Sequence, residues 1–254
     1  MLDKTNDSAF DTEFAERVKE GLWREQKSLP SRYFYDDEGD RLFKAIMRCP
    51  EYYLTDCELD VLRSHGDDIA RSLASGGRPL ELVELGSGDG LKTCLLLDAL
   101  HECAPDLVWT YRPVDISENS LELLRERIVP DRPWLDFRAL HGNYHELIPA
   151  LDSTSRRRIF VYLGSNLGNY TGQQTRAFLE LLASVMKAGD GLLIGLDLKK
   201  DPQVIRAAYN DAAGYTRDFN LNLLTRMNRE LGADFDLSGF AHQPVYDEQT
   251  GEAE

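Results

Sequence analysis

A short apolar segment that runs directly into three closely spaced glycines constrains the fold of this chain more than any other feature. Residues 82–90 read Leu-Val-Glu-Leu-Gly-Ser-Gly-Asp-Gly, and apolar residues at helical spacing follow from Leu91 to Leu100. Glycines let the backbone turn sharply and approach a ligand closely, because no Cβ obstructs either. The amides of the following helix then face the space above the sheet. The pattern predicts a strand, a glycine turn and a helix beside a bound ligand.

A carboxylate ends the next predicted strand. Residues 111–115 read Tyr-Arg-Pro-Val-Asp. At the end of the second strand of a doubly wound sheet, the Asp115 carboxylate can accept hydrogen bonds from both hydroxyls of a ribose. The glycine turn and Asp115 together indicate a cofactor that contains adenosine.

The local pattern also distinguishes between such cofactors. The glycines follow G-x-G-x-G rather than G-x-G-x-x-G, and Glu84 lies two residues before the first of them. A pyrophosphate needs an open helix N-terminus, and a nearby carboxylate would repel it. S-adenosylmethionine has no phosphate, and its sulfonium and ammonium charges suit an acidic neighbour. The pattern favours a methyltransferase, with a dinucleotide enzyme and a purely structural glycine turn as alternatives.

Composition narrows the class of protein further. A net charge of −15 argues against binding to a nucleic-acid backbone. No apolar run reaches the roughly 18 residues needed to span a bilayer, and the polar, acidic start is unlike a signal peptide. The four cysteines form no C-x-x-C pair, and His141 and His145 have no third metal ligand near them in sequence. We expect a cytoplasmic monomer that binds a small molecule and no metal, membrane or nucleic acid.

The first 78 residues are predicted to form a helical cap outside the sheet. Apolar residues at steps of four predict a helix over residues 8–26, and a shorter helix is expected around 42–47. Thr55 and Glu58 match the two members of a capping box, so a third helix is expected to begin at Thr55.

Apolar and amphipathic segments alternate from residue 79 to residue 200. Strands are expected at 81–85, 107–114, 135–140, 158–163 and 190–196, and helices at 91–104, 117–128, 145–151 and 172–187. This alternation predicts one domain of parallel strands with right-handed crossovers. Residues 201–254 are expected to form a helical region on the substrate side, broken near Gly214, and a polar tail. A class I methyltransferase sheet has seven strands, so with five the sheet is completed in another way or the chain is shortened.

Several longer motifs follow one another in a fixed order along residues 28–225. They lie at 29–39, 50–55, the glycine turn of 86–90 together with 92–93, 113–117, 142–144, 163–169, 208–214 and 219–220. In these motifs the chain resembles the histidine-specific N-α-methyltransferase family of ergothioneine biosynthesis. The resemblance implies an α/β fold, with a Rossmann-like class I methyltransferase sheet and an N-terminal helical cap. It also implies S-adenosyl-L-methionine as the cofactor.

The resemblance assigns roles to individual positions. It implies that the cofactor is bound by residues of four motifs, namely Gly86, Ser87, Gly88, Lys92, Asp115, Asn143 and Tyr144. It implies that the substrate amino acid is bound by Tyr52, Asn169 and Tyr209, and that Asn169 and Tyr35 take part in catalysis. Asn169 would accept a hydrogen of the substrate amine, and Tyr209 would donate to the substrate carboxylate. An aromatic cluster is expected to cover the site, formed by Tyr33, Phe34, Tyr35, Tyr52 and Tyr53.

The chain departs from the family pattern in two places. Asn143 stands where the family has an acidic residue for the adenine amino group, and it offers a carbonyl oxygen without charge. No segment after residue 225 matches the glutamate and serine that bind the imidazole in the family. The expected function is N-α-methylation of L-histidine to N,N,N-trimethylhistidine (hercynine). Methylation of another amino acid or amine, and cofactor binding without turnover, remain the alternatives.

Overall fold

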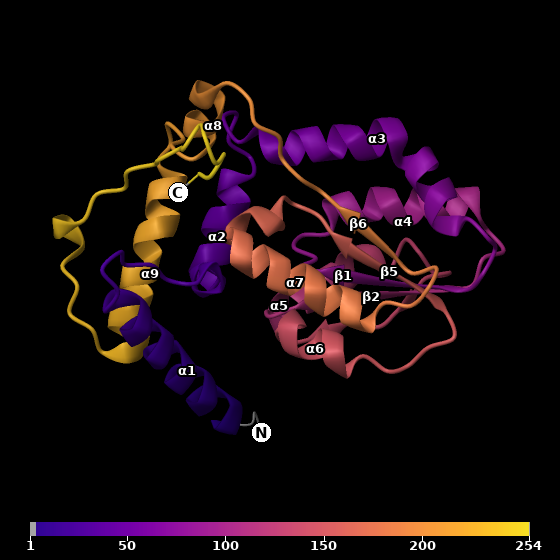
Figure 1. Ribbon diagram of the computed structural model, residues 1–254, viewed down its shortest axis with the longest axis horizontal. Coiled ribbons are helices and arrows are strands. Elements are labelled where there is room, and N and C mark those ends of the chain that lie inside the picture. The colour runs from indigo at the N-terminus through magenta and orange to yellow at the C-terminus, as the bar shows by residue number, and fades with distance from the viewer. Residues whose placement is uncertain (1–3, 254) are drawn as a thin grey trace. The chain divides into compact units, whose positions relative to one another are not determined.

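The computed structural model describes the backbone of residues 4–253 and the side chains from Thr12 onward (Figure 1). The chain divides into two compact units. A helical unit combines the residues up to Tyr53 with those from Lys199 onward, and a sheet unit spans Leu54–Leu198. Among the described helices, none combines the length and apolar character needed to cross a bilayer.

The sheet unit contains one parallel sheet. Its strands are β1 (Leu80–Leu85), β2 (Trp109–Asp115), β3 (Asp136–Phe137), β4 (Leu140–His141), β5 (Arg157–Tyr162) and β6 (Gly191–Ile194). The order across the sheet is β3-β2-β1-β5-β6, and β4 also pairs with β2. Every pairing is parallel, so the carboxyl ends of the strands meet at one edge of the sheet. The α/β fold and the parallel sheet are therefore confirmed.

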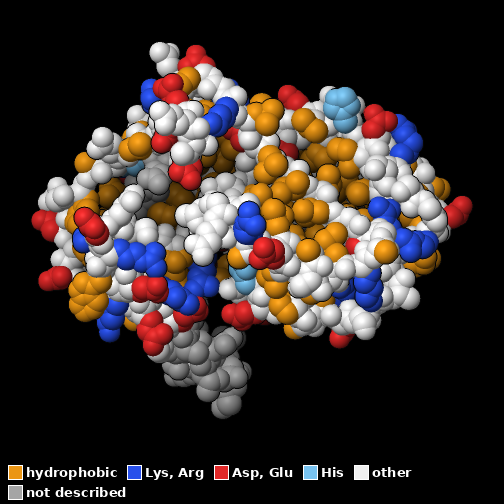
Figure 2. Space-filling view, in the orientation of Figure 1, with side chains coloured by type: hydrophobic (Ala, Val, Ile, Leu, Met, Phe, Trp, Pro, Cys, Tyr) orange, Lys and Arg blue, Asp and Glu red, His pale blue; other side chains and the backbone are white. Residues whose placement is uncertain are grey.

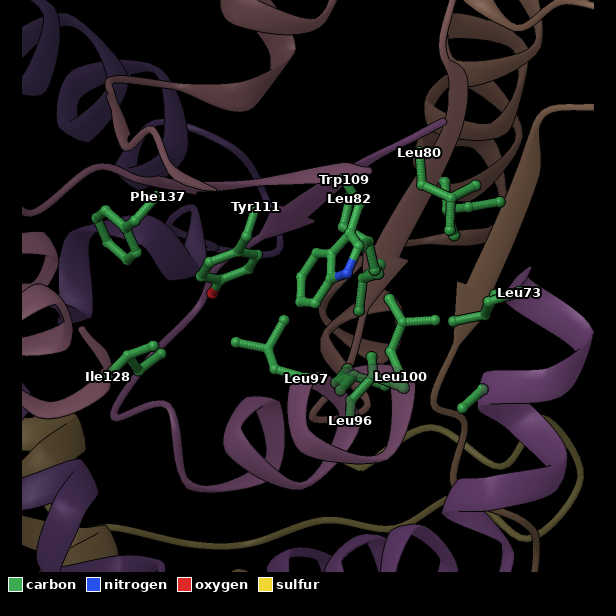
Figure 3. Close-up of a cluster of buried hydrophobic side chains, with 14 of the residues drawn as sticks. Leu73, Leu80, Leu82, Leu96, Leu97, Leu100, Trp109, Tyr111, Ile128 and Phe137 are labelled. Carbon is green, nitrogen blue, oxygen red and sulfur yellow. The ribbon is translucent and has the colours of Figure 1, made fainter. Parts of the chain in front are cut away.

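Alternate residues of the central strand β1 enter two different apolar clusters, because side chains alternate across a strand. Leu80 and Leu82 pack with Trp109 and with helix α4 (Leu91–Cys103) in one cluster (Figure 3). Val83 and Leu85 pack in the other, against α6 (Tyr144–Ala150) and α7 (Gly172–Val185). All six residues of β1 are buried as a result. The carboxyl end of β1, which carries the glycine turn of the predicted site, is thus held between two packed apolar clusters.

Helix α3 (Tyr53–Ala74) belongs to the sheet unit from Leu54 onward, although the sequence predicted it as part of a cap ending at residue 78. Its buried residues Leu62, Ala70 and Leu73 enter the same cluster as the strands, which explains the grouping. The predicted capping box is wrong. The helix begins before Thr55, and the Glu58 carboxylate bonds to other parts of the chain.

The predicted strand at 135–140 is divided into β3 and β4. Both pair with β2 in one register, with Thr110 opposite Asp136 and Val114 opposite Leu140. In that register the gap between them lies opposite Arg112 and Pro113, and Pro113 has no amide hydrogen to donate. The proline in β2 therefore interrupts the backbone hydrogen bonds to the neighbouring strand, while the register of the pairing stays the same on both sides of the gap.

Strand β6 forms one edge of the sheet. Among the described residues no strand pairs with its outer side. Figure 2 shows apolar side chains gathered where β6 runs in Figure 1, and Leu196 and Leu198 beyond it are 58% and 75% exposed. Residues 240–253 add only an isolated bridge between Tyr246 and Ala253.

The helical unit joins the two ends of the described chain. Its elements are α1 (Lys4–Leu22), η1 (Ser31–Phe34), α2 (Asp37–Ile46), α8 (Pro202–Ala208), α9 (Tyr215–Leu231) and η3 (Leu237–Gly239). Phe14 and Tyr33 pack with Leu223 and Met227 of α9 in a buried cluster. The predicted break at Gly214 is confirmed, because this glycine has φ 79° and precedes α9.

Candidate active site

The glycine turn after β1 has the backbone geometry that its sequence predicts. Gly86, Gly88 and Gly90 have φ values of 74°, 55° and 74°, in the left-handed region that side chains disfavour. A Cβ on Gly90 would lie 2.3 Å from Leu124 Cδ1, whereas nothing lies within 4 Å of a Cβ on Gly88. The turn therefore packs tightly at its helix end and leaves the backbone at Gly88 accessible to a ligand.

Asp115 lies beside this turn. The Gly86 amide donates a hydrogen bond of 2.8 Å to the carbonyl before Asp115, and the Ser117 amide donates to Asp115 Oδ1 at 3.0 Å. Burial raises the pKa of Asp115, while the amides of Ser117, Gly88 and Ile116 oppose this rise. The carboxylate thus lies among amides of two loops at the carboxyl edge of the sheet.

The Ser87 hydroxyl has no hydrogen-bond partner among the described residues. Ser87 is only 7% exposed, so water does not replace the missing partner fully. A buried, unsatisfied hydroxyl costs about 1–3 kcal/mol. A ligand atom that bonds to this hydroxyl would remove the cost.

Asn143 and Tyr144 follow β4 at the same edge. Asn143 caps α6, since its Oδ1 accepts a hydrogen bond of 3.0 Å from the His145 amide. This is the oxygen that the family resemblance assigns to the adenine amino group, and a carbonyl oxygen has a second lone pair for that contact. The Tyr144 hydroxyl bonds to Tyr170 at 2.6 Å and to Tyr162 at 3.1 Å, so its side chain belongs to the layer between α6 and α7.

Glu84 does not offer its charge to a ligand, which corrects the argument made from the sequence. The residue is 3% exposed, and Thr93 donates to its carboxylate at 2.8 Å and 2.9 Å. Tyr111 donates to the same carboxylate from β2. Burial raises the pKa of Glu84 to about 7, although these hydrogen bonds and Lys92 oppose the rise. Glu84 therefore supports the turn from within the sheet.

Lys92 lies in the first turn of α4, directly after the glycine turn. Its ammonium donates to Glu58 Oε2 at 2.5 Å, and the two side chains are 19% and 16% exposed. The predicted contact between Lys92 and the cofactor stays a prediction. The ion pair with Glu58 could not be predicted from the sequence, because Glu58 matched a capping box.

Asn169 lies in the loop after β5, at the end of the short helix η2 (Asn166–Asn169), and is exposed. Asn166 of the same loop places its Nδ2 only 3.6 Å from the Cβ position of Gly86. The loop after β5 and the glycine turn are therefore neighbours. The structure brings together the strand-end residues predicted for the cofactor and the loop that carries Asn169.

In the helical unit, Tyr35 and Tyr52 surround Phe43. Their rings lie 5.6 Å and 6.2 Å from the Phe43 ring in edge-on arrangements, and Tyr35 also lies 5.6 Å from Phe219. Tyr33 is different, because it is fully buried against Phe14, and its predicted place in a cover over the site is wrong. The role of the other aromatic residues stays a prediction.

Tyr209 ends α8 and is half-buried. Its carbonyl accepts a hydrogen bond of 2.9 Å from His242 Nε2, while Asn220 Nδ2 lies 3.0 Å from His242 Nδ1. The neighbouring Asp211 carboxylate accepts from the amide of Thr216 at 2.7 Å, which stabilises the start of α9. The sequence suggested no such role for His242, since the histidine is isolated and lies beyond the matching motifs.

No group of histidine, cysteine, aspartate or glutamate side chains within the described part of the chain could hold a metal ion. His141 lies in β4 and bonds to the Ile116 carbonyl, whereas His145 lies on α6 and bonds to the Tyr170 hydroxyl. The two histidines thus lie in different elements, and each has a hydrogen-bond partner of its own.

Comparison with known proteins agrees with this geometry. The family described as histidine-specific, S-adenosylmethionine-dependent methyltransferases matches residues 14–254. The chain belongs to this family. A histidine N-α-methyltransferase from Mycolicibacterium smegmatis is 41% identical over 89% of this chain and 68% of its own length. Ergothioneine biosynthesis protein 1 from Schizosaccharomyces pombe is 33% identical over 99% of this chain and 33% of its own length. An N-methyltransferase, fsqC, from Aspergillus fumigatus is 30% identical over 88% of this chain and 60% of its own length.

As a member of this family, the protein is an S-adenosylmethionine-dependent N-methyltransferase with a Rossmann-like fold. Its residues suit that cofactor. The backbone at Gly88 is accessible, the Ser87 hydroxyl lacks a partner, and the Asp115 carboxylate lies at the strand edge where a ribose binds in such folds. The family match also continues past residue 225, beyond the motifs that the sequence alone revealed.

Proposed function

We propose that the protein methylates the α-amino group of L-histidine and gives N,N,N-trimethylhistidine, the hercynine of ergothioneine biosynthesis. The observation that carries this proposal is the match of residues 14–254 to a histidine-specific methyltransferase family. Two relatives at 41% and 40% identity bear the name histidine N-α-methyltransferase. We further propose that the enzyme acts as a cytoplasmic monomer without nucleic-acid or membrane partners. The net charge of −15 supports the absence of nucleic-acid binding.

The cofactor supplies a methyl group that is already activated on a sulfonium. The protein must therefore align the amine with that methyl group, and alignment of this kind contributes roughly 7–11 kcal/mol. We propose that Gly86, Ser87, Gly88, Asp115 and Asn143 bind the cofactor along the carboxyl edge of the sheet. Lys92 and Tyr144 are also proposed to contact the cofactor.

The amine must be neutral when it attacks. Asn169 is proposed to accept an amine hydrogen through its side-chain carbonyl and so to direct the nitrogen lone pair. The exposure of Asn169 in the loop after β5 supports this role, since its amide is free to meet a ligand.

Residues of the helical unit are proposed to recognise the amino acid. Tyr209 would donate to the substrate carboxylate, and Tyr52 and Tyr35 would present ring faces to the amine. Aromatic faces stabilise a trimethylammonium group by about 0.5–2 kcal/mol. The packing of Tyr35 and Tyr52 around Phe43 supports the proposal, because it limits their rotation.

The proposal is tested by incubating the protein with S-adenosylmethionine and histidine and weighing the products. Mass gains of one, two and three methyl groups on histidine are expected. Gain only on another amine would replace histidine with a different substrate, and cofactor binding with no gain on any amine would leave a binding protein without turnover.

Methylation of another amine is the second candidate. Relatives at 28–30% identity include N-methyltransferases, among them a 4-dimethylallyltryptophan N-methyltransferase from Claviceps purpurea. A mixture of free amino acids and tryptophan derivatives in the same assay would identify such a substrate directly.

A further inference from the structure

The hydrogen-bond ladder between β5 and β6 stops where the candidate site begins. The last backbone bond runs from the Gly195 amide to the Tyr162 carbonyl at 2.9 Å. In an evenly spaced parallel ladder, the next donors along would be the amides of Gly164 and Asp197. Both of these amides bond to side chains instead.

The Gly164 amide donates to the carboxylate of Glu58 in α3 instead of to a carbonyl of the neighbouring strand. The two Glu58 carboxylate oxygens each accept from the Gly164 amide at 2.9 Å, and the Lys92 ammonium lies 2.5 Å from Oε2. The absence of a side chain at Gly195 makes this possible, because a Cβ there would lie 1.9 Å from Glu58 Oε1. The carboxylate is thus inserted between the ends of the two strands.

The Asp197 amide donates to the side chain of Ser165 instead of to a strand carbonyl. The Ser165 Oγ accepts from this amide at 2.9 Å. Ser165 has φ 56°, and it is the one non-glycine residue with a left-handed backbone in the described part of the chain. Such a conformation costs on the order of 1 kcal/mol and persists where neighbours hold it. The chain after β5 therefore leaves the sheet at a defined point and angle, and Asn169 follows four residues later.

We propose that Glu58 is a positioning residue of this enzyme, which separates the ends of β5 and β6 and anchors the loop of residues 163–169. It touches neither substrate nor cofactor, and it acts through the Gly164 amide on Asn169. The activity part of this inference rests on the proposed function.

Two substitutions disturb the same contact in different ways. Glu58→Ala removes the acceptor of the Gly164 amide. Gly195→Ala leaves Glu58 in place but puts a Cβ where its carboxylate lies. Each is expected to lower kcat/KM for histidine by about 10- to 100-fold, the range for a misaligned reacting group. Glu58→Gln keeps a carbonyl acceptor for Gly164 and should recover most of that loss.

The double variant separates positioning from general damage. Gly195→Ala should cost no more than about twofold in a Glu58→Ala background, because its clash partner is gone. An equal cost in both backgrounds would overturn the inference, as would wild-type kcat/KM in either single variant. Two control substitutions should leave kcat/KM unchanged. Asp60→Asn changes an exposed residue on the same helix, and Gly172→Ala adds a Cβ where nothing lies within 4 Å.

Hydrogen–deuterium exchange of residues 163–169 gives a readout that needs no activity. Glu58→Ala and Gly195→Ala should each speed exchange in this peptide about tenfold, with β1 unaffected. If wild-type protein methylates no histidine but these exchange changes appear, the proposed function fails and the anchoring of the loop stands. If histidine is methylated and exchange at 163–169 is the same in all variants, the inference fails alone.

Discussion

Tyr111 on β2 donates its hydroxyl hydrogen to the Glu84 carboxylate on the adjacent strand β1, directly beneath the glycine turn. Both residues are buried, and Thr93 from α4 donates to the same carboxylate. The bond joins the two strands whose ends carry Gly86 and Asp115. The protonation state of Glu84 therefore affects the stability of β1 and β2, the two strands that carry the predicted cofactor site.

The pH dependence of stability follows from the raised pKa of Glu84. Its value is about 7 in the folded protein against 4.5 for an ordinary glutamate, because burial outweighs the hydrogen bonds. The folded state thus holds this proton more tightly, and the resulting stabilisation is complete below about pH 4.5 and lost as the pH rises through about 7. We expect the difference in unfolding free energy between wild type and Glu84→Gln to fall by about 3 kcal/mol between these limits. Urea unfolding at several pH values measures it, and parallel curves would contradict the assignment.

Gly90→Ala is expected to destabilise the protein strongly. The new Cβ would lie 2.3 Å from Leu124, and the residue has φ 74°. Strain and overpacking together predict a loss of about 2–4 kcal/mol in unfolding free energy. Gly76→Ala is a matched control, since φ is 87° there but nothing lies within 4 Å of the Cβ, so only the strain of about 1 kcal/mol applies. Equal losses in the two variants would show that the Leu124 contact relaxes freely.

Asp115→Asn should weaken cofactor binding. Hydrogen bonds to a charged group are worth about 1.5–3 kcal/mol, so the Kd for S-adenosylhomocysteine should rise roughly 10- to 100-fold. Calorimetry gives this Kd without any turnover. The exposed Asp131→Asn should bind like wild type, and an unchanged Kd in Asp115→Asn would remove the ribose contact from this residue.

Asn169→Ala should lower kcat while leaving the Kd for S-adenosylhomocysteine unchanged. The loss of one amine hydrogen bond predicts a decrease in kcat of about tenfold or more. Asn119→Ala, an exposed change on α5 (Glu118–Ile128), serves as the control. Unchanged turnover in Asn169→Ala would exclude the proposed role in directing the lone pair.

Local patterns predicted most of the sheet unit. The glycine turn and the alternation of strands and helices depend on neighbouring residues, so periodicity and glycine placement reveal them, as they reveal the break at Gly214 in the helical unit. The sequence also pointed to Glu84, but the prediction that its carboxylate faces the cofactor is wrong, because the side chain is buried within the sheet unit. In a central strand covered on both faces, a carboxylate is buried whichever side it points to.

Contacts between distant segments could not be predicted in this way. Glu58 and Gly164 lie 106 residues apart, and a carboxylate three positions after a threonine looks like a helix cap until its real partner is seen. Tyr33 was likewise assigned to the aromatic cluster over the site, because its packing against Phe14 and near Met227 depends on the tertiary fold. These are pairings that no short window of sequence contains.

The helical unit is built from both ends of the described chain, and this has a consequence for biosynthesis. Helix α2 leaves the ribosome well before α9, and at about 5–20 residues per second the interval is roughly 10 to 30 seconds. During that interval the apolar face of α2, with Leu42 and Ile46, has no native partner in Phe219. The nascent chain therefore completes its sheet first and shields this face only after α9 has been synthesised, which makes the interval a natural window for chaperone engagement.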